Sequence, residues 1–128
     1  MPTDAGRAFL EQNGRRPDVT TTPSGLQYEV VKQGDGRKPK ATDVVSVHYR
    51  GTFIDGTTFD ASDRNGAPVS FPLNGVIGGW TEGVQLMSVG SIHNLYLPPD
   101  LAYGARGAPP TIAPNTTLIF EVELVGID

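Results

Sequence analysis

The chain of 128 residues contains no cysteine, which excludes disulfide bonds, thiol catalysis and metal sites built from thiolates. It has only two histidines, His48 and His93, and its carboxylates are scattered without the spacing of a metal-ligand set. No serine lies in a G-x-S-x-G nucleophile motif. We therefore expect neither nucleophilic catalysis nor a bound metal ion or cofactor.

An excess of positive charge is also lacking, as are long apolar runs. The net charge of −4 and the pI of about 5.0 argue against a nucleic-acid partner. No apolar run reaches the length of a membrane span, so membrane insertion is not expected. Met1 is followed by polar residues and not by a signal peptide, which predicts a cytoplasmic chain or a part cut from an exported parent.

Glycine and proline are frequent, with 16 and 11 residues, which favours a β-rich fold with many turns over a helical bundle. Apolar and polar residues alternate in several short segments, as in half-buried strands. The dipeptide Asp55-Gly56 predicts a tight hairpin turn. The predicted strands cover residues 26–32, 44–53, 57–59, 68–73, 91–97 and 117–127.

One internal helix is predicted after the fourth strand, because Trp80, Val84 and Met87 recur at helical spacing and share one face. Gly90 stands where the glycine that follows a helix is expected. A helix facing one antiparallel sheet is a two-layer α+β domain.

The N-terminal residues predict a short helical lead over 2–13, with Thr3 or Asp4 as its cap and Asn13-Gly14 as its end. Residues 15–25 are polar and contain two prolines, which is typical of a linker.

Neither histidine is predicted to be catalytic. His48 alternates with Val47 and Tyr49, which places it on the solvent side of its strand. His93 shares a face with Leu95 and Leu97, so we expect a partly buried histidine whose ring nitrogens are hydrogen-bonded.

Four stretches resemble the FKBP-type peptidyl-prolyl cis-trans isomerases, in the family's order and with near-family spacing. They are VSVHYRGTFIDGTTFDAS (45–62), VIGGWTEGVQLMSVG (76–90), PPDLAYGARG (98–107) and PNTTLIFEVELVGI (114–127). Residues 8–36 resemble the bacterial Mip-like (macrophage infectivity potentiator) subgroup, where a long helix leads into the catalytic domain. The resemblance implies an isomerase domain over 25–128, preceded by a helical remnant and linker over 1–24. It also implies an FKBP-like fold, an antiparallel sheet of about five to six strands wrapped around one short α-helix.

The resemblance implies a pocket for the substrate's proline, with Trp80 as its floor. Its catalytic residues would be the carboxylate of Asp60, the hydroxyl of Tyr103, the backbone N–H of Ile77, and Phe59. Val69 occupies a position often held by phenylalanine, so one wall is expected to be lower. The remaining implied pocket residues are Tyr49, Val76, Phe120, Ile112 on the loop above, and Arg64 as the partner of Asp60.

The implied function is a protein-folding assistant that accelerates rotation about Xaa-Pro bonds without a cofactor. Its partners would be proline-containing peptides, unfolded protein clients and the macrolide inhibitors tacrolimus and rapamycin. We expect a monomer, because almost all of the subgroup's dimerisation region is absent, and a periplasmic or outer-surface location for an exported parent. Two alternatives stay open: a module of the same fold that holds clients without turnover, and an interaction domain whose pocket residues are merely core.

Overall fold

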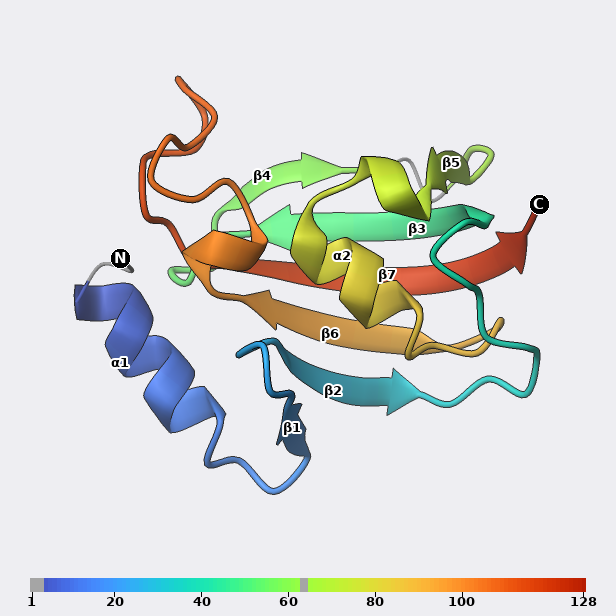
Figure 1. Ribbon diagram of the computed structural model, residues 1–128, viewed down its shortest axis with the longest axis horizontal. Coiled ribbons are helices and arrows are strands. Elements are labelled where there is room, and N and C mark those ends of the chain that lie inside the picture. Colours follow the sequence, from blue (N-terminus) through green and yellow to red (C-terminus); the bar gives the residue numbers. More distant parts are fainter. Residues whose placement is uncertain (1–3, 63–64) are drawn as a thin grey trace.

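The computed structural model describes residues 4–62 and 65–128 and contains a seven-stranded sheet in the order β1-β2-β6-β7-β3-β4, with β5 also paired to β3 (Figure 1). All pairs of neighbouring strands are antiparallel. The elements in chain order are α1 (Asp4–Asn13), β1 (Val19–Thr21), β2 (Gln27–Lys32), β3 (Val44–Thr52), β4 (Thr58–Ala61), β5 (Val69–Pro72), the 3-10 turn η1 (Leu73–Gly75), α2 (Gly78–Val84), β6 (Ile92–Leu97), the 3-10 turn η2 (Pro99–Leu101) and β7 (Leu118–Ile127).

The core lies between α2 and the inner face of the sheet, as Figure 1 shows. The longest strand, β7, contributes Leu118, Phe120, Val122 and Leu124, all buried on the face that the alternation predicts. The predicted α+β class is thus confirmed, and each of the six predicted strands is present.

The seventh strand, β1, lies in the stretch that was predicted as a polar linker. Val19 is buried, and Val19–Thr21 pairs with Gln27–Glu29 of β2. A strand of three residues with one apolar side chain is too short for a period-two pattern, so the linker prediction was wrong for these residues.

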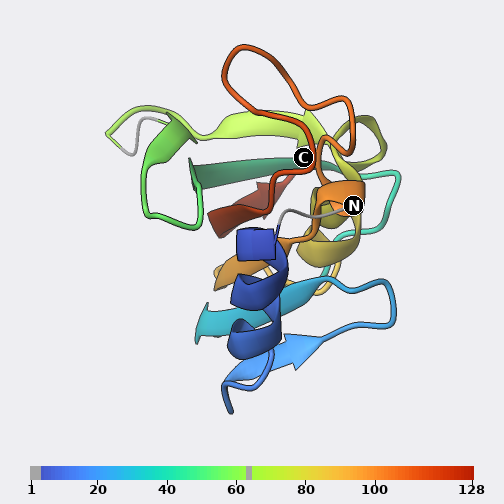
Figure 2. The same cartoon turned by 90° about the vertical axis from the view of Figure 1, so that its left-hand side faces the viewer.

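The N-terminal helix α1 stands at one end of the sheet, next to β1 (Figures 1 and 2). Asn13 ends the helix as predicted, and its Nδ2 donates to Gln27 Oε1 at 2.8 Å. Arg16 pairs with Glu29 at 2.7 Å, which ties the residues after α1 to β2. The cap predicted at Thr3 lies outside the described residues.

Helix α2 is shorter than predicted. It ends at Val84, and Met87 is buried in a following turn in which its N–H bonds to Val84 O at 3.0 Å. Gly90 has a φ of +95°, as expected of a glycine after a helix, but it belongs to the turn into β6 and donates to Leu124 O at 2.8 Å. The prediction of a helix that ends at Gly90 was therefore wrong.

His93 lies on the face that the sequence predicts but lacks the predicted hydrogen bonds. It is 2% exposed, and neither ring nitrogen has a partner within the described part of the chain. Its ring stacks on Tyr28, with centroids 5.8 Å apart and an 8° angle between the planes. Burial lowers the pKa of His93, and the nearby positive charge of Lys38 lowers it further.

We expect His93 to make the fold sensitive to acid. Because its pKa is lower in the folded than in the unfolded chain, the unfolded chain takes up the proton first. The free energy of unfolding should therefore fall as the pH drops below about 6.5, by up to about 1.4 kcal/mol per pH unit. Urea unfolding at pH 7.5 and pH 5.5 measures this loss.

The His93→Phe variant keeps an aromatic ring against Tyr28 and removes the titrating group. It should lose less stability than the unchanged chain between the two pH values. The control is His48→Phe, because His48 is only partly buried and its Nδ1 lies 3.3 Å from Ser62 Oγ. An equal loss in the unchanged chain and the His93→Phe variant would contradict the assignment.

Candidate functional site

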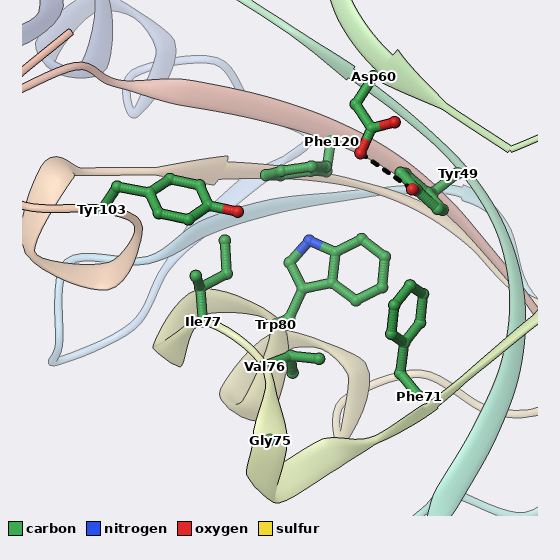
Figure 3. Close-up of a pocket in the computed structure, with 9 residues that line it drawn as sticks. All are labelled: Tyr49, Asp60, Phe71, Gly75, Val76, Ile77, Trp80, Tyr103 and Phe120. Carbon is green, nitrogen blue, oxygen red and sulfur yellow. Dashed lines mark hydrogen bonds between the residues drawn. The ribbon is translucent and has the colours of Figure 1, made fainter. Parts of the chain in front are cut away.

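A cavity of about 350 Å³ opens beside the start of α2 (Figure 3). This volume is in the range of small-ligand pockets. Its nine lining residues are Tyr49, Asp60, Phe71, Gly75, Val76, Ile77, Trp80, Tyr103 and Phe120. They come from β3, β4, β5, η1, α2 and β7 and from the segments beside α2 and after η2, so the fold assembles the cavity from distant parts of the chain. Seven of the nine are residues that the sequence predicted, the exceptions being Phe71 and Gly75.

Trp80 lies at the bottom of this cavity and is held by three other rings. It is 4% exposed, and it meets Tyr49, Phe71 and Phe120 edge-on at centroid distances of 5.3, 5.5 and 5.4 Å. Such edge-to-face pairs are favourable beyond the area they bury, so the indole is held in one orientation. Its Nε1 is buried and has no hydrogen-bond partner among the residues that the structure describes.

The helix brings Trp80 close to the sheet because the residue before it is Gly79. A Cβ on Gly79 would lie 2.3 Å from Leu97 Cγ, so only glycine allows α2 to approach β6 this closely. Gly79 in the first turn of α2 thus sets the depth of the cavity floor.

Polar groups gather at the rim opposite η1. The Tyr49 hydroxyl donates to Asp60 Oδ2 at 3.0 Å, as Figure 3 shows. Burial raises the pKa of Tyr49 to about 12, and the hydrogen bond and charge of Asp60 and the nearby Tyr103 raise it as well. Tyr49 is therefore a neutral donor at physiological pH, while Asp60 is exposed at the mouth. The hydroxyl of Tyr103 points over Ile77 toward the centre of the group in Figure 3.

Ile77 caps α2 with its backbone. Its carbonyl accepts the N–H groups of Trp80 at 2.9 Å and Thr81 at 3.1 Å, and its φ of −60° and ψ of 151° are extended. No acceptor for the Ile77 N–H is found among residues 4–62 and 65–128. This amide is available to a ligand carbonyl.

Other predicted residues lie elsewhere. Phe59 supports the site from behind, since its ring meets Phe120 at 5.7 Å and Phe53 at 4.9 Å without lining the cavity. Ile112 is 4% exposed in the core and pairs with Ala108 through two backbone hydrogen bonds. Val69 is partly buried on β5 and does not line the cavity, and Arg64 lies outside the described residues.

One cavity wall was expected to be low because of Val69. Phe71, and not Val69, forms the cavity wall on β5. It lies two residues further along β5, on the same face, and its ring also meets Tyr49 at 6.0 Å. The alternation of Val69, Ser70 and Phe71 was a usable signal, because it places both apolar residues on one side of the strand. Gly75, at the end of η1, has no side chain and gave no signal.

No cluster of three or more metal-ligating side chains occurs among the described residues, and Ser, His and Asp do not form a nucleophile arrangement at the cavity. Within the same residues, no helix has the length and apolar character that crossing a membrane requires.

Comparison with known proteins shows that all nine cavity residues lie within a segment that matches a known family. The family model described as FKBP-type peptidyl-prolyl cis-trans isomerase matches residues 35–125. A second, described as the domain amino terminal to FKBP-type peptidyl-prolyl isomerase, matches residues 2–30.

Two relatives and one solved structure illustrate the similarity. The FKBP-type peptidyl-prolyl cis-trans isomerase FkpA of Aeromonas hydrophila is 55% identical over 96% of this chain and 46% of its own length. The peptidyl-prolyl cis-trans isomerase Mip of Coxiella burnetii is 47% identical over 97% of this chain and 54% of its own length. The crystal structure of a peptidyl-prolyl cis-trans isomerase from Pseudomonas syringae has a TM-score of 0.91 and 39% identity, and covers 97% of this chain and 91% of that one. The chain thus spans about half the length of the curated relatives it matches.

Proposed function

The chain belongs to the family of FKBP-type peptidyl-prolyl cis-trans isomerases, and we propose that its pocket accelerates rotation about Xaa-Pro peptide bonds in protein substrates. The observation that carries the proposal is the enclosure of Trp80 by the rings of Tyr49, Phe71 and Phe120 beneath a rim of few polar groups. A flat apolar floor of this kind suits a proline ring.

The chemistry requires little more than such a pocket. The amide C–N bond has partial double-bond character, and its rotation meets a barrier of about 18–20 kcal/mol. The twisted amide has lost resonance and carries less charge separation than the planar one. A dry aromatic pocket therefore disfavours the planar ground state more than the twisted state, which is differential binding of the transition state. Each tenfold gain in rate needs only about 1.4 kcal/mol.

The polar groups then have positioning and electrostatic roles. We assign the Ile77 N–H and the Tyr103 hydroxyl to hydrogen bonds with substrate carbonyls, since both belong to residues that line the cavity. Asp60 accepts a hydrogen bond from the Tyr49 hydroxyl. We assign it an electrostatic role, in which its charge acts on the substrate carbonyl, and not the role of a base. No proton transfer and no cofactor takes part, so the rate in D₂O should be close to the rate in H₂O, and a large solvent isotope effect would contradict this role.

The proposed partners follow from this pocket. We propose that proline-containing peptides and unfolded proteins are its substrates, that tacrolimus and rapamycin occupy the same cavity, and that residues 25–128 carry the activity of a monomer. Residues 4–24 stabilise this domain from one end, through Asn13 and Arg16.

The test is the cis-to-trans exchange of a Leu-Pro or Phe-Pro peptide, measured by NMR with and without tacrolimus. We expect acceleration that the inhibitor abolishes. Inhibitor binding without acceleration would indicate a module that holds clients without turnover. Absence of both, with no change in Trp80 fluorescence on adding peptide, would indicate an interaction domain whose pocket residues are core.

A further inference from the structure

Strand β4, which carries Asp60, ends at Ala61, and the residue after it is tied to β3 through the backbone of Tyr49. The Ser62 N–H donates to Tyr49 O at 2.9 Å. The Ser62 hydroxyl accepts the Tyr49 N–H at 2.8 Å, and Ser62 Oγ lies 3.3 Å from Tyr49 O and 3.3 Å from His48 Nδ1. Ser62 therefore contacts both backbone hydrogen-bonding groups of a residue that lines the cavity.

The Ser62 hydroxyl stands in for a backbone carbonyl of a regular sheet. Opposite residues in a hydrogen-bonded antiparallel pair exchange two N–H···O=C bonds. Ser62 and Tyr49 form one of these bonds, and the acceptor of the other is the hydroxyl of Ser62. The side chain thus lets the main chain leave the sheet after Ala61 while the Tyr49 N–H keeps an acceptor.

The carboxylate of Asp60 has little other support. It is exposed, and the Tyr49 hydroxyl at 3.0 Å is its only hydrogen-bond partner among the residues that the structure describes, as Figure 3 shows. Strand β4 has four residues, lies at the edge of the sheet, and pairs with β3 through a register that shifts between Gly51 and Thr52. The end of such a strand opens easily, since few contacts hold it.

We propose that Ser62 is a positioning residue for the isomerase, whose hydroxyl fixes Tyr49 against the end of β4 and so keeps the Tyr49 hydroxyl and the Asp60 carboxylate hydrogen-bonded. The proposal rests on the isomerase function and adds to it a residue that does not line the cavity. Without the hydroxyl, the Tyr49 N–H loses its acceptor and the end of β4 is free to move away from β3. Asp60 then loses the fixed position from which its charge acts on the substrate carbonyl.

The experiment compares the NMR exchange of a Leu-Pro peptide catalysed by the unchanged chain and by Ser62→Ala. We expect kcat/KM to fall about fivefold, which corresponds to the loss of one hydrogen bond between neutral groups. Ser62→Thr keeps the hydroxyl and should keep the rate. Ser62→Cys keeps the size of the side chain but is a weak acceptor, so it should lose rate as Ser62→Ala does, and it replaces that variant if thermal unfolding shows that the alanine variant is not folded.

A double-mutant cycle separates this role from a general loss of packing. The Tyr49→Phe variant keeps the ring and removes the hydroxyl that donates to Asp60. In this background Ser62→Ala should lower kcat/KM further by less than about twofold, because the two substitutions disable the same hydrogen bond. A residue that acts only on stability would lower the rate by the same factor in both backgrounds.

Ser46→Ala is the matched control, because it removes a serine hydroxyl from β3, the strand that carries Tyr49. Ser46 is partly buried, and its hydroxyl bonds to Asp128 Oδ1 at 2.8 Å and lies 3.2 Å from Ser70 Oγ. This variant should keep kcat/KM.

The proposal is overturned if Ser62→Ala keeps the rate of the unchanged chain, or if Ser62→Thr or Ser46→Ala loses as much rate as Ser62→Ala. It is also overturned if Ser62→Ala has an equally large effect in Tyr49→Phe. Failure of the unchanged chain to accelerate any peptide would instead reject the isomerase function, and this role of Ser62 with it.

Discussion

Replacing Trp80 with leucine is expected to lower kcat/KM for Xaa-Pro isomerisation at least tenfold. The indole forms the floor of the cavity and is the common partner of Tyr49, Phe71 and Phe120. Leucine is apolar but smaller and not flat, so water enters beneath the proline ring and the three rings lose the partner that orients them. Loss of about 1.4 kcal/mol of transition-state stabilisation is enough for a tenfold decrease in rate. The measurement is NMR exchange with a Leu-Pro peptide, expressed per folded molecule.

The same variant also removes core volume, and we expect its free energy of unfolding to fall by about 2–4 kcal/mol. The control therefore has to lose core packing away from the cavity. Leu124→Val does so, because Leu124 is fully buried in β7 and does not line the cavity. This control should lose stability and keep its activity per folded molecule. If Trp80→Leu stays as active as Leu124→Val, Trp80 is an ordinary core residue.

Replacing Gly79 with alanine is expected to produce a large loss of stability from the addition of a single methyl group. Its Cβ would lie 2.3 and 2.4 Å from Leu97 Cγ and Cδ2, and 3.1 Å from Leu101 O. Leu97 is fully buried, so its side chain has no free space into which to move. We expect a decrease of about 3 kcal/mol in the free energy of unfolding, or roughly 10 °C in the melting temperature. Chemical and thermal unfolding measure both.

Gly78 provides a matched control in the same helix. A Cβ there would make an ordinary contact of 3.6 Å with Leu101 Cδ2, and Gly78 is exposed. Gly78→Ala should be neutral or stabilising by up to about 1 kcal/mol, because alanine is the better helix former. Similar losses in the two variants would mean that a backbone requirement shared by both positions, and not the approach of α2 to β6, explains the glycines.

Much of the site could be predicted because its parts are encoded in short segments. Val76, Ile77 and Trp80 lie within five consecutive residues, and Asp60 is adjacent to Phe59, so a local motif specifies their relative positions. The same holds for the strands, where alternation assigned Leu118 and Phe120 to the buried face before any contact was known.

The choice between Val69 and Phe71 could not be made in this way. Both lie on one face of β5, and alternation alone allows either to reach the cavity. The pairing of Val47 with Val69 and of Val45 with Phe71 sets their places along β3. The approach of α2 then brings Trp80 against Phe71 at 5.5 Å. That contact depends on a register and a helix position that neither segment encodes.

The same reason explains the other differences. Val19–Thr21 becomes a strand because β2 offers it a partner, and the glycine signal at Gly90 belongs to a turn because Leu124 O accepts its N–H. Periodicity and turn residues were sufficient for the faces of strands and for the fold class, since these depend on neighbouring residues, whereas the pocket residues were predicted only through the resemblance of short motifs to a known family. Packing between segments far apart in the chain decided which side chains meet across the core and which part of the rim stays open. These features could not be predicted from either segment alone, because the free energy of a contact depends on both residues that form it.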